Sequence, residues 1–398
     1  MYFPRYAEAS VRRLAEHFPA VVVSGARQSG KTTLLRHCFP DYSYVSLDLP
    51  SKAEQAERNP DAFFADHPEP LIIDEVQYAP AIFRHLKVRI DADRHRNGRF
   101  LLTGSQDFTL MGGVSESLAG RVGILRLETL ALNELPMPYR TDTSRAGLLH
   151  KMVRGHFPEL WRQPDLSTYD YYAAYLATYL ERDVRQVLNV GSLRDFERFL
   201  RVLAVRSGSV LNKSDVARDV GISLKAVADW ISVLHVSGQI ALLEPWFTNI
   251  TKRVVKTPKL YFCDSGLLSF LLNLTPETLP PSQMLGAVWE TWLYAELRKQ
   301  LQNARKPAAL WFYRDQRGRE VDFVLERGGE LAFLEAKWHE HPGQKEAQTI
   351  LTLAEELHAT GSRWNAGRLA VIGTPPNSYP ITETVDAIGV ADMERVLA

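Results

Sequence analysis

A phosphate-binding loop near the N-terminus constrains this chain more than any other feature. Residues 25–32 read GARQSGKT and fit the pattern G-x-x-x-x-G-K-[ST] without a mismatch. The β-branched stretch 20–24 before the loop predicts a buried parallel strand, and residues 32–37 after it can continue as a helix. The alternative is a chance glycine-rich turn, and the strand and helix predicted on either side of the loop weigh against it. Because strand, glycine loop and helix follow in this order, the sequence predicts an α/β nucleotide-binding domain.

Each part of the loop has a role in holding a nucleotide. Gly25 and Gly30 let the backbone turn tightly and point its N–H groups at phosphate oxygens. Lys31 supplies a positive charge, and the Thr32 hydroxyl can ligate Mg²⁺. We therefore expect ATP and Mg²⁺ as cofactors. The residues expected to hold the nucleotide are Gly25, Ala26, Arg27, Gln28, Ser29, Gly30, Lys31, Thr32 and Thr33.

A second nucleotide-site motif is the apolar stretch 71–75, LIIDE, which ends in two carboxylates. After a phosphate-binding loop, such a stretch is typical of a Walker B strand. Asp74 would then hold Mg²⁺ through water, and Glu75 would polarise the water that attacks the γ-phosphate. The alternative is an ordinary strand followed by an acidic turn, and the upstream loop weighs against it.

Two later positions are candidates for contact with the γ-phosphate. The stretch 99–105 predicts a third strand ending in Thr-Gly-Ser, where a hydroxyl can touch the γ-phosphate or the attacking water. Ser105 is the first choice and Thr103 the second, with a plain strand-end turn as the alternative. Arg121, before the strand-like run 123–127, can reach a neighbouring subunit's γ-phosphate as an arginine finger. Its alternative role is a solvated or lid-pairing arginine.

Size and charge bound the remaining questions. A chain of 398 residues fits two to four domains at roughly 100–200 residues per domain. With 47 basic and 47 acidic side chains the net charge is +0, so a polyanion would need a local basic patch. The sequence has no apolar run of membrane-spanning length and no secretory signal core, so we expect a soluble, cytoplasmic protein without a membrane partner. Cys38 and Cys263 form no C-x-x-C pair and are expected to be reduced.

The middle of the chain has the pattern of a winged helix-turn-helix. Residues 195–205 predict one amphipathic helix, and residues 212–237 predict two more helices separated by a turn at Gly221. Residues 239–244 and 259–262 can pair as a wing. The basic residues expected near its tip are Lys252, Arg253, Lys256 and Lys259.

This pattern leaves two roles open for the middle region. The last helix would expose Ser223, Lys225, Ala226 and Asp229 at its start, a weakly basic set with a carboxylate that opposes phosphate. The wing lysines are therefore the better candidates for DNA contact. Packing against the ATPase as a lid, or binding of a protein, is an equally weighted alternative.

The C-terminal region carries two acids and a lysine in a spaced pattern. One predicted strand has Asp322 near its start, and a second ends in Glu335-x-Lys337. Because strand side chains alternate, Glu335 and Lys337 point to the same face. A preceding helix, predicted over 287–300, offers Glu290 as a third acid.

In a restriction-endonuclease-like fold these residues would form a metal-dependent site. Asp322 and Glu335 would bind Mg²⁺, with Glu290 as a further acid, and Lys337 would orient or activate the water that attacks a phosphodiester. The pattern is loose and leaves two interpretations open. The site either cleaves nucleic acid or binds DNA or a metal without turnover.

The motifs together resemble one family over nearly the whole chain. GARQSGKT, LIIDEVQ, FLLTGSQ and SLAGRV resemble the signatures of bacterial and archaeal AAA-type (AAA+) ATPases that carry a C-terminal domain of unassigned function with a restriction-endonuclease-like (PD-(D/E)xK) fold. Residues 130–135 resemble the segment leading into the helical lid, and 155–159 with 179–184 resemble the linker. The resemblance implies an α/β P-loop ATPase with a parallel sheet and a helical lid, a winged helix, and a nuclease-like α/β domain.

The expected organisation has four parts. An ATPase core covers 1–129, a lid and linker 130–190, a winged helix 191–280 and a nuclease-like domain 281–398. The leading hypothesis is an ATP-hydrolysing protein that acts on DNA as a homo-oligomer such as a ring, because Arg121 would need a neighbour's nucleotide. One alternative is a nucleotide-state switch whose inert C-terminal modules bind a protein partner. Another is a nuclease under ATP control.

Overall fold

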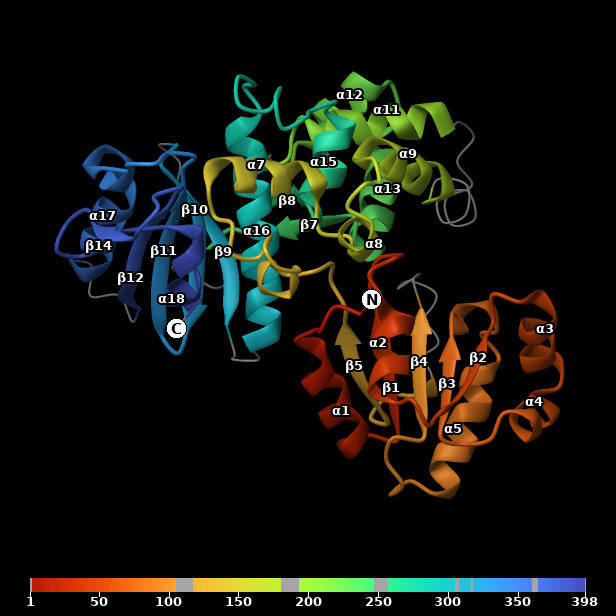
Figure 1. Ribbon diagram of the computed structural model, residues 1–398. Coiled ribbons are helices and arrows are strands. Elements are labelled where there is room, and N and C mark those ends of the chain that lie inside the picture. Colours follow the sequence, from red (N-terminus) through yellow and green to blue (C-terminus); the bar gives the residue numbers. More distant parts are fainter. Residues whose placement is uncertain are drawn as a thin grey trace. The chain divides into compact units, whose positions relative to one another are not determined.

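The chain divides into two compact units, and each is described on its own. The computed structural model describes residues 2–104, 117–179, 193–246, 257–304, 308–315, 318–359 and 364–397. The first unit comprises Met1–Leu130 together with Phe157–Arg162 and Ser232–Gln239, and the second unit comprises the rest of the chain. Figure 1 traces the elements in sequence order.

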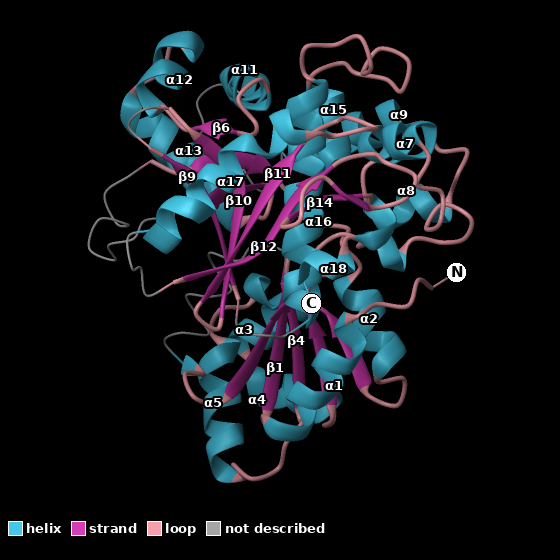
Figure 2. Cartoon of the chain, turned by 90° about the vertical axis from the view of Figure 1, so that its left-hand side faces the viewer, coloured by secondary structure: helices cyan, strands magenta, loops and turns pink. Residues whose placement is uncertain are grey.

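A five-stranded parallel sheet forms the centre of the first unit. Its strands lie in the order β2-β3-β4-β1-β5, and all neighbouring pairs are parallel. They are visible side by side in the lower half of Figure 2. The strands span Ala20–Ser24 (β1), Ser43–Ser46 (β2), Leu71–Asp74 (β3), Phe100–Gly104 (β4) and Val122–Arg126 (β5). The predicted α/β class and the strands expected around residues 20–24, 71–75 and 99–105 are confirmed.

Helices cover both faces of this sheet because successive residues of its strands point to opposite sides. Val21 and Val23 of β1 pack in one buried cluster with residues of α1 and α2. Ala20 and Val22 pack in another, with residues of α3, α4 and α5. The helices span Ala7–His17 (α1), Lys31–Cys38 (α2), Pro50–Arg58 (α3), Pro60–Asp66 (α4) and Ile82–Ala92 (α5), and the short α8 is Pro158–Arg162.

The second unit begins with helices α7 (Arg145–Arg154), α9 (Thr168–Tyr179) and α15 (Ser265–Leu271). Asp264 caps α15 by accepting hydrogen bonds from Gly266 N and Leu267 N, both at 3.0 Å. It also accepts from the Tyr172 hydroxyl at 2.7 Å and His156 N at 2.8 Å. One buried carboxylate thus connects the start of α15, the residue His156 after α7 and the Tyr172 side chain of α9, which gives the 155–159 segment a structural role.

The middle region alternates helices with a small antiparallel sheet of order β6-β8-β7. Its elements are α11 (Leu193–Ala204), β6 (Ser209–Val210), α12 (Lys213–Val220), α13 (Leu224–Val236), β7 (Ile240–Leu243) and β8 (Lys259–Phe262). Gly221, with φ +82°, makes the turn between α12 and α13. The three predicted helices are confirmed. The basic positions Lys252, Arg253 and Lys256 lie outside the described residues.

A six-stranded mixed sheet, of order β13-β14-β12-β11-β10-β9, completes the second unit. The β9–β10 and β10–β11 pairs are antiparallel, while β11–β12 and β12–β14 are parallel. The elements are α16 (Leu285–Ala304), β9 (Ala309–Arg314), β10 (Glu320–Arg327), β11 (Glu330–Ala336), α17 (Gln344–Ala359), β12 (Asn365–Ile372), β13 (Tyr379–Pro380), β14 (Val385–Ile388) and α18 (Glu394–Leu397).

The two sheets of the second unit are joined at their edges. Beyond β7, Pro245 forms a parallel bridge with Phe312 of β9, and Trp246 N donates to Phe312 O at 2.6 Å. Helix α16 lies against both β8 and β11 (Figure 1). This junction brings β8, α16 and β10 together around one group of charged side chains. In the described parts of the chain, no helix has the length and apolar character needed to cross a membrane.

Candidate functional site

The phosphate-binding loop connects β1 to α2 in the predicted manner. Gly25 and Gly30 have φ of +140° and +96°, values that suit glycine. A Cβ at Gly25 would lie 2.1 Å from the Leu127 carbonyl oxygen, so no other residue fits there without movement. Helix α2 begins at Lys31, so the N–H groups of its first turn, which have no carbonyl partner within the helix, can bind phosphate together with the loop.

Lys31 and a second basic side chain hold this loop together. Lys31 is buried, and its Nζ donates to Gly25 O at 3.0 Å and Ala26 O at 2.9 Å. Arg5, which no motif marked as a site residue, donates from Nη1 to Ser29 O at 2.9 Å and from Nη2 to Glu128 O at 2.7 Å. Both side chains therefore donate to backbone carbonyls of the loop and its surroundings.

A hydroxyl and a carboxylate meet where Mg²⁺ was expected. Thr32 Oγ1 donates to Asp74 Oδ1 at 2.7 Å, and Thr103 Oγ1 also donates to Oδ1. Hydroxyl and carboxylate oxygens are ligands that Mg²⁺ prefers, and the ion usually keeps several waters. The donor set therefore fits the predicted ion, which Thr32 would bind directly and Asp74 through water.

Tyr44 completes the surroundings of Asp74. Its hydroxyl donates to Asp74 Oδ2 at 3.1 Å. Burial, followed by the nearby Asp74 charge, raises the pKa of Tyr44 to about 12, so the hydroxyl stays protonated and donates. No sequence signal pointed to Tyr44, because it reaches the carboxylate from the neighbouring strand β2.

Glu75 lies directly after β3 in a left-handed backbone conformation, with φ of 54°. Its backbone N–H donates to Thr103 Oγ1 at 3.1 Å, which ties the strand end to β4. Its carboxylate accepts a hydrogen bond from Gln77 Nε2 at 2.5 Å. Gln77 is buried in the short 3₁₀ helix Val76–Tyr78 and was missed from the sequence as a partner of the predicted catalytic acid.

The two predicted γ-phosphate contacts differ in what can be said of them. Ser105 lies outside the described residues, whereas the second choice, Thr103, faces Asp74. Arg121 precedes β5, which runs parallel to β1 with Ala20 opposite Val122, so it lies at the end of the sheet away from the loop. Its guanidinium forms an ion pair with Asp91, with Nε to Oδ1 at 2.6 Å. A role for Arg121 at a neighbour's nucleotide stays a prediction.

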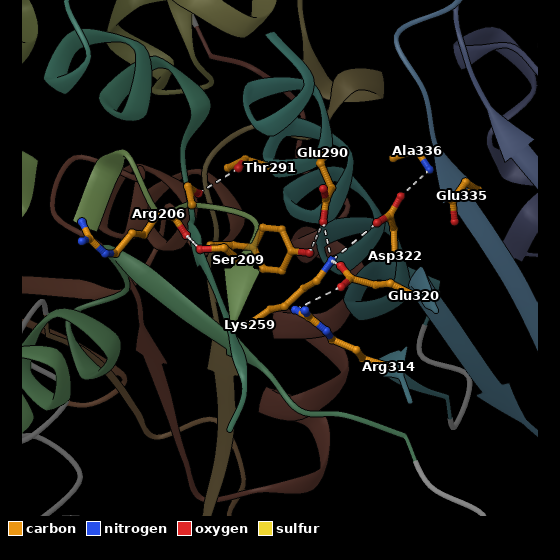
Figure 3. Close-up of polar contacts among 12 residues, drawn as sticks. Arg206, Ser209, Lys259, Glu290, Thr291, Arg314, Glu320, Asp322, Glu335 and Ala336 are labelled. Carbon is orange, nitrogen blue, oxygen red and sulfur yellow. Dashed lines mark hydrogen bonds and ion pairs between the residues drawn. The ribbon is translucent and has the colours of Figure 1, made fainter. Parts of the chain in front are cut away.

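The acids predicted in the C-terminal region lie close together (Figure 3). Asp322 of β10 accepts a hydrogen bond on Oδ2 from Ala336 N at 2.9 Å. Glu335 of β11 accepts on Oε1 from Lys337 Nζ at 2.6 Å. The other oxygen of Glu335, Oε2, is buried and has no hydrogen-bond partner among the described residues. The third acid, Glu290, projects from α16 into the same group of side chains.

Lys259 enters this group from β8, and its predicted position was wrong. It was expected near an exposed wing tip, but it is only 1% exposed. Its Nζ donates to Glu290 Oε1 at 2.9 Å, lies 3.5 Å from Asp322 Oδ1 and also contacts Glu320. The reason is that α16 packs against β8 and that Glu320 and Asp322 of β10 lie beside Lys259, so its side chain is covered.

Burial shapes the ionisation of this cluster. Burial first, and then the charge of Asp322, raises the pKa of both Glu290 and Glu335 to about 7. Burial alone would lower the pKa of Lys259, but the carboxylates of Glu290, Asp322 and Glu320 raise it above its ordinary value. Lys259 is therefore charged at neutral pH.

The arrangement around Lys259 does not fit the predicted Mg²⁺. Across the described ranges, no group of three or more His, Cys, Asp or Glu side chains is arranged to hold a metal ion. Glu290 and Asp322 both face the ammonium group of Lys259 (Figure 3). Metal binding by Glu290, Asp322 and Glu335 thus stays a prediction that this arrangement does not favour.

Comparison with known families identifies three regions. Residues 17–136 match the family described as AAA domain. Residues 146–278 and 285–393 match two domains of unknown function, DUF8612 and DUF4143. The chain therefore carries an AAA-type ATPase domain followed by two domains whose function is unassigned. The predicted boundaries at 129, 190 and 280 stay a prediction.

Similar proteins add little about activity. Two uncharacterized mycobacterial proteins, from Mycobacterium tuberculosis and Mycobacterium bovis, are each 28% identical over 387 residues, which is 96% of this chain and 83% of theirs. The Walker-type ATPase of Pyrococcus abyssi is 15% identical and covers 68% of this chain and 96% of its own, with a TM-score of 0.47. The Thermotoga maritima RuvB Holliday junction branch migration motor is 18% identical and covers 60% and 89%, with a TM-score of 0.33. These TM-scores are too low to define a shared fold.

Proposed function

We propose that this protein binds ATP with Mg²⁺ at the loop 25–32, hydrolyses it and uses the cycle to act on DNA. The observation that carries the ATPase part is the hydrogen-bonded group of Thr32, Asp74 and Thr103 directly beside Glu75. A metal-holding pair, a hydroxyl sensor and an acid then lie at the end of three neighbouring elements, α2, β3 and β4. The AAA domain match over the same residues supports this proposal.

Each residue of this group has a definable task. The loop N–H groups bind the phosphates, and Lys31 exchanges the carbonyls of Gly25 and Ala26 for phosphate oxygens. Bound Mg²⁺ supplies charge neutralisation on the phosphates. Glu75 orients the attacking water and accepts its proton, while the Gln77 amide holds the Glu75 carboxylate in place.

The middle region supports DNA as the substrate through its fold pattern. The order helix, strand, helix, turn, helix and two strands agrees with the predicted winged helix, with Ser223, Lys225 and Asp229 at the start of α13. Since Lys259 is buried, a phosphate contact would depend on Lys225, which is exposed, and on other exposed cations.

The C-terminal region supports a nuclease-like fold without supporting cleavage. Helix α16 precedes the antiparallel strands β9, β10 and β11, and helix α17 and the parallel strand β12 follow, which agrees with the predicted α/β composition and with the predicted helix and strands around Glu290, Asp322 and Glu335. Lys337 Nζ lies 2.6 Å from Glu335 Oε1, and Figure 3 shows Asp322 near Glu335. Cleavage is not part of the proposed function because Lys259 contacts the acids that a metal would need.

A nucleotide-state switch that binds a protein partner is the second candidate function. It is favoured by the neutralised charges of α12, where Arg218 Nη2 lies 2.7 Å from Asp215 Oδ1 and Arg206 forms an ion pair with Asp219. Paired cations on an exposed helix give little attraction for phosphate. Under this alternative the middle and C-terminal regions recognise protein instead of DNA.

ATP turnover with and without DNA separates the two candidates. If the protein acts on DNA, duplex, single-stranded or forked DNA stimulates ATP hydrolysis. The stimulation falls at higher salt, because the logarithm of the binding constant for duplex DNA drops by about 0.9 per neutralised phosphate for each tenfold rise in salt concentration. Lys225→Glu should reduce the stimulation while leaving turnover without DNA unchanged. Turnover that no DNA alters, together with undetectable DNA binding at low salt, would leave the switch as the function.

Mixing of two inactive variants tests whether the nucleotide site is shared between subunits. Arg121→Ala subunits keep their own Glu75, and Glu75→Gln subunits keep Arg121. If Arg121 acts on a neighbour's nucleotide, each variant alone is inactive and the mixture regains turnover. An Arg121→Ala variant that is fully active by itself would show that the ion pair with Asp91 is structural only.

A further inference from the structure

One ammonium group joins carboxylates from two different elements of the second unit. Lys259 Nζ donates to Glu290 Oε1 of α16 at 2.9 Å, lies 3.5 Å from Asp322 Oδ1 of β10 and contacts Glu320 of the same strand. Figure 3 shows these side chains converging on the lysine, Glu290 from above and Asp322 and Glu320 from the right. Burial of this ammonium group depends on the three carboxylates around it, since an unpaired buried ammonium would be strongly unfavourable.

The backbone fixes Lys259 in this position. Lys259 pairs with Val210 of β6 on one side and with Leu243 of β7 on the other. Tyr261, two residues further along, projects to the same face and donates from its hydroxyl to Glu290 Oε1 at 2.5 Å. Lys259 and Tyr261 of β8 therefore both donate to Glu290.

Among the described residues, one buried carboxylate oxygen of the cluster has no hydrogen-bond partner. Glu320 Oε2 also has Arg314 Nη1 at 3.5 Å, and Glu335 Oε1 has Lys337 Nζ at 2.6 Å. Glu335 Oε2, however, is buried without a hydrogen-bond partner in the described chain, and Glu335 itself is 8% exposed. Lys259, Lys337 and Arg314 therefore leave part of the hydrogen-bonding capacity of these acids unused.

We propose that Lys259 is the resident cation of this carboxylate site and competes with a divalent metal ion for Glu290 and Asp322. While Lys259 occupies its place, the site is closed to Mg²⁺ and Mn²⁺. Removal of the ammonium leaves a group of hard oxygen donors of the kind these ions prefer. This inference concerns the C-terminal site alone and holds whether the ATPase acts on DNA or on a protein.

The competition follows from charge and from the lack of screening water. A dication held by the same carboxylates would face an ammonium group of the same sign at close range, and Lys259 is 1% exposed, so water does not weaken the repulsion. Each N–H of the ammonium group donates to one carboxylate oxygen at hydrogen-bond distance, whereas a metal ion needs several oxygens at about 2 Å. The two cations therefore exclude each other.

Titration of Mn²⁺ into the nucleotide-free protein, followed by electron paramagnetic resonance and calorimetry, tests this proposal. All proteins carry Asp74→Asn, so that the predicted metal position at the phosphate-binding loop does not contribute. The parent should show no Mn²⁺ site that depends on Asp322. Lys259→Met should gain one site that is at least about 10-fold tighter than any binding to the parent, and the site should disappear in Lys259→Met with Asp322→Asn.

Lys259→Arg is the matched control, because it keeps a cation of similar reach. It should bind Mn²⁺ no better than the parent, and its melting temperature should not respond to Mn²⁺. Lys259→Met should melt at a lower temperature in chelator and recover when Mn²⁺ is added. If Lys259→Met fails to fold, the parent still decides. An Asp322-dependent Mn²⁺ site in the parent, or equal binding by the parent and Lys259→Met, would overturn the proposal.

Discussion

The substitution Glu75→Gln should separate ATP binding from ATP hydrolysis. The carboxylate of Glu75 accepts a hydrogen bond from Gln77 Nε2 at 2.5 Å, and its backbone N–H donates to Thr103 Oγ1 at 3.1 Å. An amide at position 75 can turn its carbonyl oxygen toward Gln77 and leaves the backbone contact in place. The shape of the site is therefore retained while the proton acceptor is lost.

The size of the effect follows from these contacts. Loss of a positioned general base lowers turnover by about 10²- to 10⁴-fold, which corresponds to roughly 3–5 kcal/mol in the activation barrier. Exchange of a charge-assisted hydrogen bond for a neutral one costs only about 1 kcal/mol of stability. A large loss of turnover should therefore accompany a small change in melting temperature.

Phosphate release in single-turnover and steady-state assays measures the loss of turnover. Binding of a fluorescent ATP analogue measures ATP affinity, and thermal melting measures stability. Glu54→Gln is the control, since Glu54 is an exposed glutamate that forms an ion pair with Arg58 in α3, and it should behave like the parent. Turnover of Glu75→Gln within about twofold of the parent, against the 10²-fold minimum for a lost base, would refute the assigned role. A matching loss of ATP affinity would make Glu75 a binding residue instead.

Three further outcomes are expected. Gly25→Ala should destabilise the first unit by about 1–3 kcal/mol from backbone strain alone, with more from the Cβ placed 2.1 Å from Leu127 O, whereas Gly286→Ala, with open space at its Cβ, should leave denaturant unfolding unchanged or slightly improved. Lys31→Ala should abolish detectable ATP binding in calorimetry while the fold is kept, and unchanged affinity would remove Lys31 from the site. Burial lowers the pKa of Lys151 to about 8. Between that pH and the ordinary lysine pKa near about 10.4 the unfolded chain binds more protons than the folded chain, so stability should rise with pH over this range. Melting curves of Lys151→Met should lack this rise.

The ATPase part of the fold was predictable because its information is local. The strand 20–24 is a continuous buried run, as parallel strands covered on both faces require, and GARQSGKT fixes the turn that follows it. The order of the strands in the sheet was not predictable from such runs, because it depends on pairings between distant segments. Strand β4, which inserts between β1 and β3, brings Thr103 against Asp74 only through that order.

Several residues of the site were missed for a related reason. Arg5 contacts Ser29, 24 positions away, and Glu128, 123 positions away, so no motif spacing connects them. Tyr44 and Gln77 belong to elements whose sequence shows only ordinary strand and turn character. Such residues act through neighbours in space, and a single sequence marks the residue that carries the chemistry more clearly than those that hold it.

Lys259 shows how far this limit reaches. A lysine at the start of a short strand is expected to be exposed, and a position on a wing was accordingly predicted for it. Its acids follow 31 to 63 positions later, and the family matches divide the group, since Lys259 falls in the region 146–278 while Glu290 and Asp322 fall in 285–393. Nuclease chemistry inferred from the acids and Lys337 alone omits the cation that contacts them. Whether a C-terminal region of this kind can bind a metal should therefore depend on the residue that the preceding region supplies at position 259.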